Sequence, residues 1–130
     1  MIFKQRKGAD YNNLGANAEQ WAQQYLEAQG LTIVANNYRT PRGEIDLIMQ
    51  EGNTRVFVEV RLRSASQFGS AADSIDARKQ RHLVYAAQHY LQSEKLWDQV
   101  SCRFDAICLS KDHGISNEYQ VEWLRNAFSA

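Results

Sequence analysis

Residues 43–63 read GEIDLIMQEGNTRVFVEVRLR, two mainly apolar segments separated by the turn-forming residues Glu51-Gly52-Asn53. This pattern predicts a β-hairpin. Its acidic residues stand where strands usually carry Val or Ile: Asp46 interrupts the first apolar run, and Glu59 lies within the second. Because successive side chains of a strand point to opposite faces, the second segment has one apolar and one mixed face. The apolar face consists of Val56, Val58, Val60 and Leu62, and the mixed face of Phe57, Glu59, Arg61 and Arg63.

The two acidic residues allow two interpretations. A buried carboxylate costs several kcal/mol unless something pairs with it. A divalent cation with oxygen ligands is one such partner. The alternative is a structural ion-pair network with Arg61, Arg63 or Arg39. Asp46 and Glu59 are thirteen residues apart with the turn between them, which favours two carboxylates at one end of an antiparallel ladder. This spacing resembles the PD-(D/E)xK nuclease motif, with Arg61 in place of its lysine.

Length and composition are typical of one globular domain. The chain has 130 residues, of which 44% are hydrophobic and 11% aromatic. Fifteen basic and fifteen acidic residues give a net charge of zero, so any nucleic-acid footprint must be local. The N-terminal sequence MIFKQRKG lacks the apolar segment of a signal peptide, and no apolar run reaches eighteen residues. Together with Cys102 and Cys108, expected to be reduced thiols, these features predict a cytoplasmic protein without a membrane segment.

The remaining elements are predicted from periodicity and from helix-stop and turn residues. Residues 1–13 form a flexible basic arm. Apolar residues at helical spacing predict a first helix from Leu14, with Asn13 as N-cap and Gly30 as the stop. The other predicted segments are a strand at 31–35, a loop at 36–43, a polar loop at 64–74 that contacts or gates substrate, a helix at 75–93, a strand at 102–109, a turn at 112–114 and a strand at 119–124.

The second predicted helix begins with a basic cluster, Arg78, Lys79 and Arg81. Basic charge in a first helical turn opposes the helix dipole, a cost that phosphate binding would offset. Ordinary surface charge is the alternative. His82 and His89 on the same helix are seven residues apart, a spacing that does not favour zinc. No nucleotide-binding or serine-hydrolase motif is present in the sequence.

Beyond the hairpin, a resemblance covers nearly the whole chain. The segments LGANAEQWAQQYLEAQGLTIVANNYR, GEIDLI, FVEVR, FGSAADSIDARKQRHLVYAAQHYL, RFDAICL and VEWLRNAF are similar to the YraN family of uncharacterised bacterial proteins. That family in turn resembles archaeal Holliday-junction resolvases. The resemblance and the element order imply an α/β fold with a restriction-endonuclease-like core. A central mixed β-sheet would be flanked by helices in the order α-β-β-β-α-β-β, with residues 14–130 as a single nuclease-like domain.

What the resemblance implies about function is a metal-dependent nuclease acting on DNA phosphodiesters, including branched or flap structures. Its alternatives are a non-catalytic nucleic-acid-binding module and a protein-interaction domain. DNA is the expected partner, and a homodimer is allowed. Mg²⁺ or Mn²⁺ is the expected cofactor. The implied catalytic residues are Asp46, Glu59 and Arg61; the implied metal ligands are Asp46, Glu59, the backbone carbonyl of Val60 and Glu19; the implied nucleic-acid-binding residues are Arg63, Arg78, Lys79 and Arg81.

Arg61 and Glu44 have side chains whose roles in this implied site are restricted by chemistry and by position. Arg61 can stabilise negative charge but cannot act as a general base, because a guanidinium group stays protonated at any working pH. Glu44 belongs to the same GEIDLI segment, but at the entrance of the strand its side chain is expected to face solvent.

Overall fold

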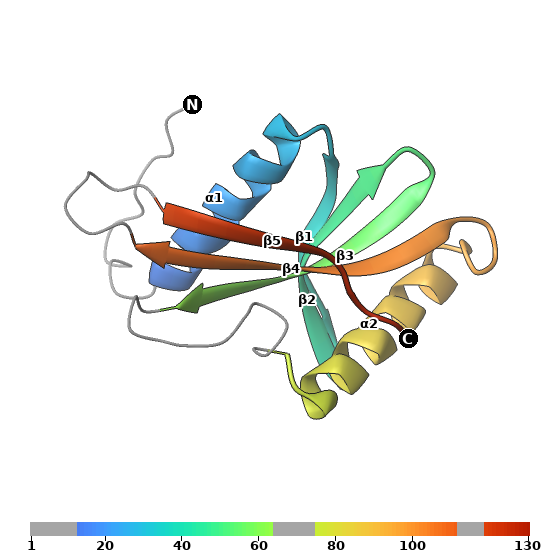
Figure 1. Ribbon diagram of the computed structural model, residues 1–130. Coiled ribbons are helices and arrows are strands. Elements are labelled where there is room, and N and C mark those ends of the chain that lie inside the picture. The colour runs from blue at the N-terminus through green and yellow to red at the C-terminus, as the bar shows by residue number, and fades with distance from the viewer. Residues whose placement is uncertain (1–12, 64–74, 112–118) are drawn as a thin grey trace.

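The computed structural model describes residues 13–63, 75–111 and 119–130. Its elements are α1 (Asn13–Ala28), β1 (Thr32–Thr40), β2 (Gly43–Glu51), β3 (Thr54–Arg63), α2 (Ala77–Ser93), β4 (Ser101–Lys111) and β5 (Tyr119–Phe128) (Figure 1). The five strands form one sheet in the order β1-β2-β3-β4-β5. The β3–β4 pair is parallel and the other pairs are antiparallel. The predicted α/β class, mixed sheet and element order are therefore confirmed.

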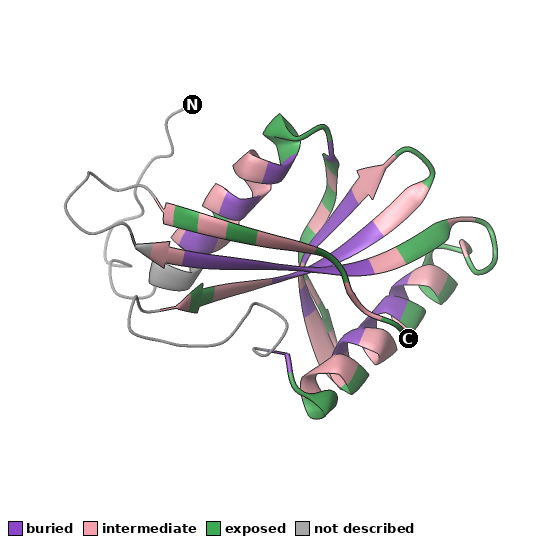
Figure 2. Ribbon diagram, viewed as in Figure 1, coloured by how far each residue is buried: buried purple, intermediate pink, exposed green. Residues whose placement is uncertain are grey.

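The two helices lie on opposite faces of the twisted sheet (Figure 1). α2 is the crossover between β3 and β4, as a parallel pair requires a long connection. Each face has its own buried cluster, one under α1 and one under α2. The central strands are consequently buried on both sides, which Figure 2 shows as purple along their middle sections.

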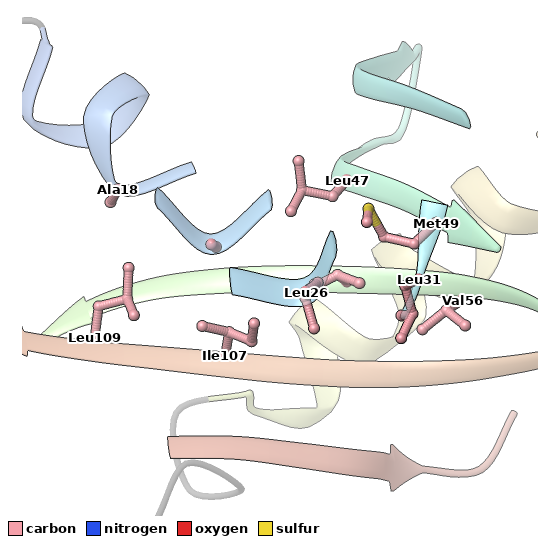
Figure 3. Packing of buried hydrophobic residues seen from close by; sticks show 10 residues of the cluster. Ala18, Leu26, Leu31, Leu47, Met49, Val56, Ile107 and Leu109 are labelled. Atoms are coloured by element: carbon pink, nitrogen blue, oxygen red, sulfur yellow. The ribbon is translucent and has the colours of Figure 1, made fainter. Parts of the chain in front are cut away.

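α1 packs through small and apolar residues that recur at helical spacing. Ala18, Ala22 and Leu26 are buried in one cluster with strand residues that include Val58 and Ile107. Figure 3 shows Ala18 and Leu26 of this helix above Ile107 and Leu109 of β4. The helix ends in a Schellman turn, in which the Leu31 N–H donates to the Leu26 carbonyl at 3.1 Å and the Gly30 N–H to the Glu27 carbonyl at 3.1 Å. Gly30 has φ 105°, so the predicted glycine stop is confirmed.

α2 begins two residues later than predicted. Asp76 is its N-cap, and the Asp76 carboxylate accepts a hydrogen bond from the Lys79 N–H at 2.8 Å. Ile75 precedes the cap and is buried, which explains why its apolar side chain fitted the helical pattern. The helix buries one stripe against the sheet, formed by Leu83, Ala86, Ala87 and Tyr90.

The predicted loop at residues 36–43 is wrong. β1 continues to Thr40, with Tyr38 paired to Ile45 and Thr40 to Gly43 of β2, which leaves only Pro41 and Arg42 for the turn. The polar residues that suggested a loop belong to an edge strand, where outward side chains meet solvent and need not be apolar. β4 and β5 likewise extend beyond the predicted 102–109 and 119–124.

Three predictions lie outside the described residues: the basic arm apart from Asn13, the polar loop at 64–74 and the turn at 112–114. Cys102 is exposed and Cys108 is buried. None of the helices in the described part of the chain is long and apolar enough to cross a membrane.

Candidate functional site

The hairpin separates at the level of its acidic residues. β2 and β3 pair from the turn as far as Leu47 and Val58, where their ladder ends. On the far side of Asp46, Ile45 packs in the cluster under α2, whereas Leu47 packs in the cluster under α1. Residues two apart in a regular strand share a face, so β2 reverses its faces at Asp46.

β1 is distorted at the same level. Asn37 lies between Asn36, paired with Leu47, and Tyr38, paired with Ile45, so it stands opposite Asp46. Its φ of 53° is a left-handed conformation that Asn adopts more readily than most residues. β1 and β2 therefore reverse their faces at the same level, and this reversal lets the Asp46 side chain point toward β3.

Asp46 takes the place of a backbone partner for β3. Its Oδ2 atom accepts a hydrogen bond from the Val60 N–H at 2.9 Å. A side chain therefore fills the position next to the ladder where a main-chain carbonyl of β2 would otherwise bond. Glu59, the residue before Val60, follows directly after the last paired residue, Val58. The fork between β2 and β3 thus brings Asp46 and Glu59 together, as the hairpin spacing predicted.

Glu59 is a buried carboxylate with two cations on one oxygen. The residue is 3% exposed. Its Oε2 atom lies 3.1 Å from Arg61 Nε and 3.5 Å from Lys79 Nζ. Its Oε1 atom is buried and accepts no hydrogen bond from a described residue. The Glu59 and Asp46 carboxyl groups share a hydrogen bond when one of them is protonated. Arg61 Nε likewise makes no hydrogen bond to a described residue, so the Arg61–Glu59 contact is an ion pair with poor alignment.

Burial and mutual repulsion raise the pKa of three carboxyl groups in the site. Burial, followed by the charge of Asp46, raises the pKa of Glu59 to about 7, against the opposing effect of Lys79 and Arg61. Burial and the same Asp46 charge raise the pKa of Glu19 to about 7. Burial also raises the pKa of Asp46, although the Val60 N–H and Lys79 favour its ionised form. Glu19, Asp46 and Glu59 therefore behave as one acidic cluster.

Glu19 reaches the cluster from α1, which lies on the opposite face of the sheet from α2. It lies beside a polar hollow of about 120 Å³ whose other lining residues are Gln20, Gln23, Asn36, Asn37 and Leu47. A water molecule takes up about 30 Å³ of liquid, so the hollow has room for several waters next to Glu19. The charge of Asp46 acts on Glu19, so the structure places Glu19, predicted from the resemblance alone, close to Asp46.

The acidic cluster offers few oxygen ligands to a divalent cation. No group of three or more Asp, Glu, His or Cys side chains within residues 13–63, 75–111 and 119–130 is arranged to hold a metal as it stands. Mg²⁺, however, usually keeps several waters and binds one or two carboxylates together with substrate phosphate oxygens. The Glu59 carboxylate and the adjacent Asp46 carboxylate supply that number. The residues therefore fit a hydrated ion that the substrate completes.

The predicted basic cluster divides in two. Lys79 turns toward Glu59, whereas Arg78 and Arg81 are exposed. The contact between Lys79 and Glu59 could not be predicted from the sequence, because only the packing of the crossover helix brings the two residues together. Arg63 lies at the end of β3 with its Nη1 atom 3.8 Å from Glu122. Arg61 pairs with Glu59, which is one of the pairs that the ion-pair alternative named.

Glu44 is not merely a solvent-facing residue. Its Oε2 atom lies 3.6 Å from Arg39 Nε, and its side chain is 42% exposed. Its negative charge nevertheless raises the pKa of both Glu19 and Asp46. Glu44 therefore belongs to the electrostatic surroundings of the cluster, although no geometry here makes it a ligand.

A second buried carboxylate, missed by the sequence reading, has a structural explanation. Asp105 of β4 accepts hydrogen bonds from Arg103 Nε at 3.0 Å, Trp123 Nε1 at 3.0 Å and the Asn126 N–H at 2.9 Å. Both of its oxygens are thus satisfied by β4 and β5. Asp105 fastens the edge strand to the sheet and has no vacancy for a ligand.

Comparisons with known proteins agree on one family. The sequence model of the uncharacterised protein family UPF0102 matches residues 18–109, a segment that contains the whole candidate site. A UPF0102 protein of Pseudomonas fluorescens strain Pf0-1 is 46% identical over 116 residues, covering 89% of this chain and 92% of the relative. One of Nitrosomonas europaea is 49% identical over 89% of this chain and 93% of its own. A UPF0102 protein of Methylobacillus flagellatus is 50% identical over 90% of this chain and 97% of the relative.

Proposed function

Since this chain belongs to the uncharacterised protein family UPF0102, whose matched relatives are named by family alone, we propose its function from the site. The protein is a metal-dependent nuclease of restriction-endonuclease-like fold that hydrolyses DNA phosphodiesters, with branched or flap structures as candidate substrates. The mixed sheet, with its acidic hairpin next to the crossover helix, supports the fold assignment.

The observation that carries the proposal is the fork in the hairpin. Asp46 and Glu59 meet where the β2–β3 ladder ends, and both keep a raised pKa in a buried setting. A purely structural acid is normally fully paired, as Asp105 is. Glu59 instead has a buried oxygen that accepts no hydrogen bond from the described residues, and its carboxyl group lies against that of Asp46. An arrangement that is costly in the free protein and suited to a cation favours a functional site.

Asp46 and Glu59 would hold Mg²⁺ or Mn²⁺, assisted by the Val60 carbonyl and by Glu19. The ion would supply a water of lowered pKa and would offset negative charge on the phosphate. The protein's own contribution is to orient these oxygens and to keep positive charge beside them. Arg61 lies next to Glu59 and can stabilise developing negative charge, but it cannot accept a proton.

A second candidate function is a nucleic-acid-binding module that keeps the fold and has lost turnover. Two observations favour it: Arg61 stands where the motif has lysine, and no ready three-ligand group occurs in the described part of the chain. A protein-interaction domain is the third candidate. It is supported by the ion pairs of Glu59 with Arg61 and Lys79, if these are purely structural.

Cleavage assays separate these candidates. Wild type and Asp46→Asn are incubated with branched, flap, single-stranded and duplex DNA in Mn²⁺. A nuclease cleaves at least one of these substrates, and the variant does not, because one of its two carboxylates has become an uncharged amide. Binding without cleavage by wild type would favour the module. Absence of both binding and cleavage would favour the interaction domain.

A further inference from the structure

We propose that Lys79 of α2 is a catalytic cation that contacts the phosphate undergoing cleavage. This inference rests on the proposed nuclease function and gives Lys79 a role beyond general attraction of DNA. It supplies an ammonium group beside a hairpin motif whose own basic residue is Arg61, because Lys79 reaches the Glu59 carboxylate from a different element.

Both cations contact the same oxygen of Glu59, but they reach it from different elements. Lys79 Nζ is 3.5 Å from Glu59 Oε2, and Arg61 Nε is 3.1 Å from the same oxygen. Lys79 belongs to α2, whereas Arg61 lies on β3, two residues from Glu59. A phosphate that binds next to the Glu59 carboxylate would therefore lie within reach of the Lys79 ammonium group.

α2 fixes the starting point of the Lys79 side chain. The backbone N–H of Lys79 is held by the Asp76 cap at 2.8 Å, and the Gln80 side chain donates to the Ile75 carbonyl at 3.0 Å. Ile75 is itself buried under the helix start. The first turn is therefore anchored on both sides of Lys79, whereas the side chain remains about one-third exposed. A partly exposed ammonium group on a fixed backbone suits a group that must change partner.

Formal charges explain why Lys79 would change partner. Without metal, the carboxylates of Asp46 and Glu59, when both are ionised, balance the two cations Lys79 and Arg61. A divalent cation on the carboxylates removes the need for both cations and leaves positive charge in surplus, which attracts an anionic phosphate. Lys79 is the better group to move, because its ammonium is a compact charge on a flexible stem. Arg61 is attached to the same strand, two residues from Glu59.

The test compares Lys79→Met and Lys79→Arg with Lys95→Met, which removes the same charge from an exposed residue beyond the far end of α2. Cleavage of flap and single-stranded DNA is measured in Mn²⁺. Binding to the same DNA is measured against salt in Ca²⁺, after gel analysis has established that the DNA stays intact. Thermal unfolding without metal establishes that each variant is folded.

If Lys79 contacts the phosphate, Lys79→Met lowers kcat on the order of a hundredfold. It also reduces the salt slope of DNA binding by about one, the value for one lost phosphate contact. Lys79→Arg restores the slope, and Lys95→Met changes neither quantity. If Lys79 only neutralises Glu59, Lys79→Met would instead lower the unfolding temperature and leave kcat and the salt slope unchanged.

The outcomes separate this inference from the proposed function. Wild-type cleavage with an equally active, folded Lys79→Met overturns the role of Lys79 and leaves the nuclease proposal standing. DNA binding without cleavage by wild type overturns the nuclease proposal and the catalytic role together, and the salt slope then reports whether Lys79 contacts phosphate in a binding module. Absence of both binding and cleavage overturns both proposals.

Discussion

A protonated carboxyl group is far less costly to bury than a carboxylate, and this difference governs the residues of the acidic cluster. Glu19 and Glu59 both have a pKa raised to about 7. Near neutral pH the cluster consequently retains protons that isolated glutamates would have lost. A divalent cation and these protons compete for the same oxygens, so the stability of the fold and the affinity for metal must both depend on pH.

The first prediction concerns stability without metal. The folded pKa of Glu59, about 7, exceeds the ordinary value of 4.5, so the folded state binds more protons between these values. The resulting stabilisation is fully present below the ordinary pKa and is lost as pH rises through about 7. The free energy of unfolding, measured by urea titration in EDTA from pH 4.5 to 8, should therefore fall across this range. Glu59→Gln cannot ionise and should show a smaller fall. A stability that rises with pH equally in both proteins would contradict the raised pKa.

The second prediction concerns metal. Mg²⁺ or Mn²⁺ should raise the unfolding temperature more at pH 8 than at pH 6, because protons on Glu19 and Glu59 leave as the ion binds. At a metal concentration a hundred times Kd the gain is about 2.7 kcal/mol. Asp46→Asn should lose the gain, and above pH 7 it should be at least as stable as wild type without metal, since one repelling charge is gone. Equal metal responses in the two proteins would rule out the site.

Among single residues, the sequence predicted contacts best between residues that are close along the chain. Asp46 and Glu59 share a hairpin, so period-two alternation and a short turn suffice to bring them together. The contact of Lys79 with Glu59 could not be predicted in this way, because it depends on where the crossover helix packs on the sheet. The left-handed Asn37, which accompanies the reversal of β1 and β2, also lay in a segment predicted to be a loop.

At the scale of elements, the position of α2 is set by a close approach to the start of β2. A Cβ on Gly43 would overlap the backbone carbonyl of His82, which no side-chain rotation can relieve. Glycine is therefore required here by the packing of α2, whose first turn carries Lys79. The strand entrance, the helix and the acidic cluster are in this way connected through one contact.

The third prediction tests that connection. Gly43→Ala should displace α2 and destabilise the fold by about 1–3 kcal/mol, as overpacking does. Because Lys79 moves with the helix, the metal-dependent gain in unfolding temperature should change as well. Gly52→Ala is the matched control: its φ of 61° makes alanine strained, yet an added Cβ meets nothing within 4 Å. That strain costs about 1–2 kcal/mol and should leave the metal gain intact. Identical metal gains in both variants would separate α2 packing from the site.

For the whole molecule, the sequence predicted the class and the order of the elements because these depend on local periodicity. The mixed character of the sheet was implied by the resemblance, since strand direction is not a local property. The strand limits were less accurate. Residues 36–40 are polar because β1 is an edge strand, and β5 extends to Phe128 because Asp105 of β4 secures the Asn126 N–H there. Pairing with a distant strand decides such limits, and a short sequence window does not contain that partner.

The distribution of charge over the whole molecule leads to the last prediction. Equal numbers of acidic and basic residues provide no long-range attraction for DNA, so affinity must come from cations near the site. Arg78 and Arg81 are exposed on the first turns of α2, next to Lys79. Replacing both with alanine should reduce the slope of log affinity against log salt by about two, one for each phosphate contact. Lys95→Ala, which removes an exposed charge beyond the other end of α2, should leave the slope unchanged. If the double variant keeps the wild-type slope, DNA does not lie across the start of α2. If wild type binds no DNA even at low salt, the ion pairs around Glu59 are those of an interaction domain.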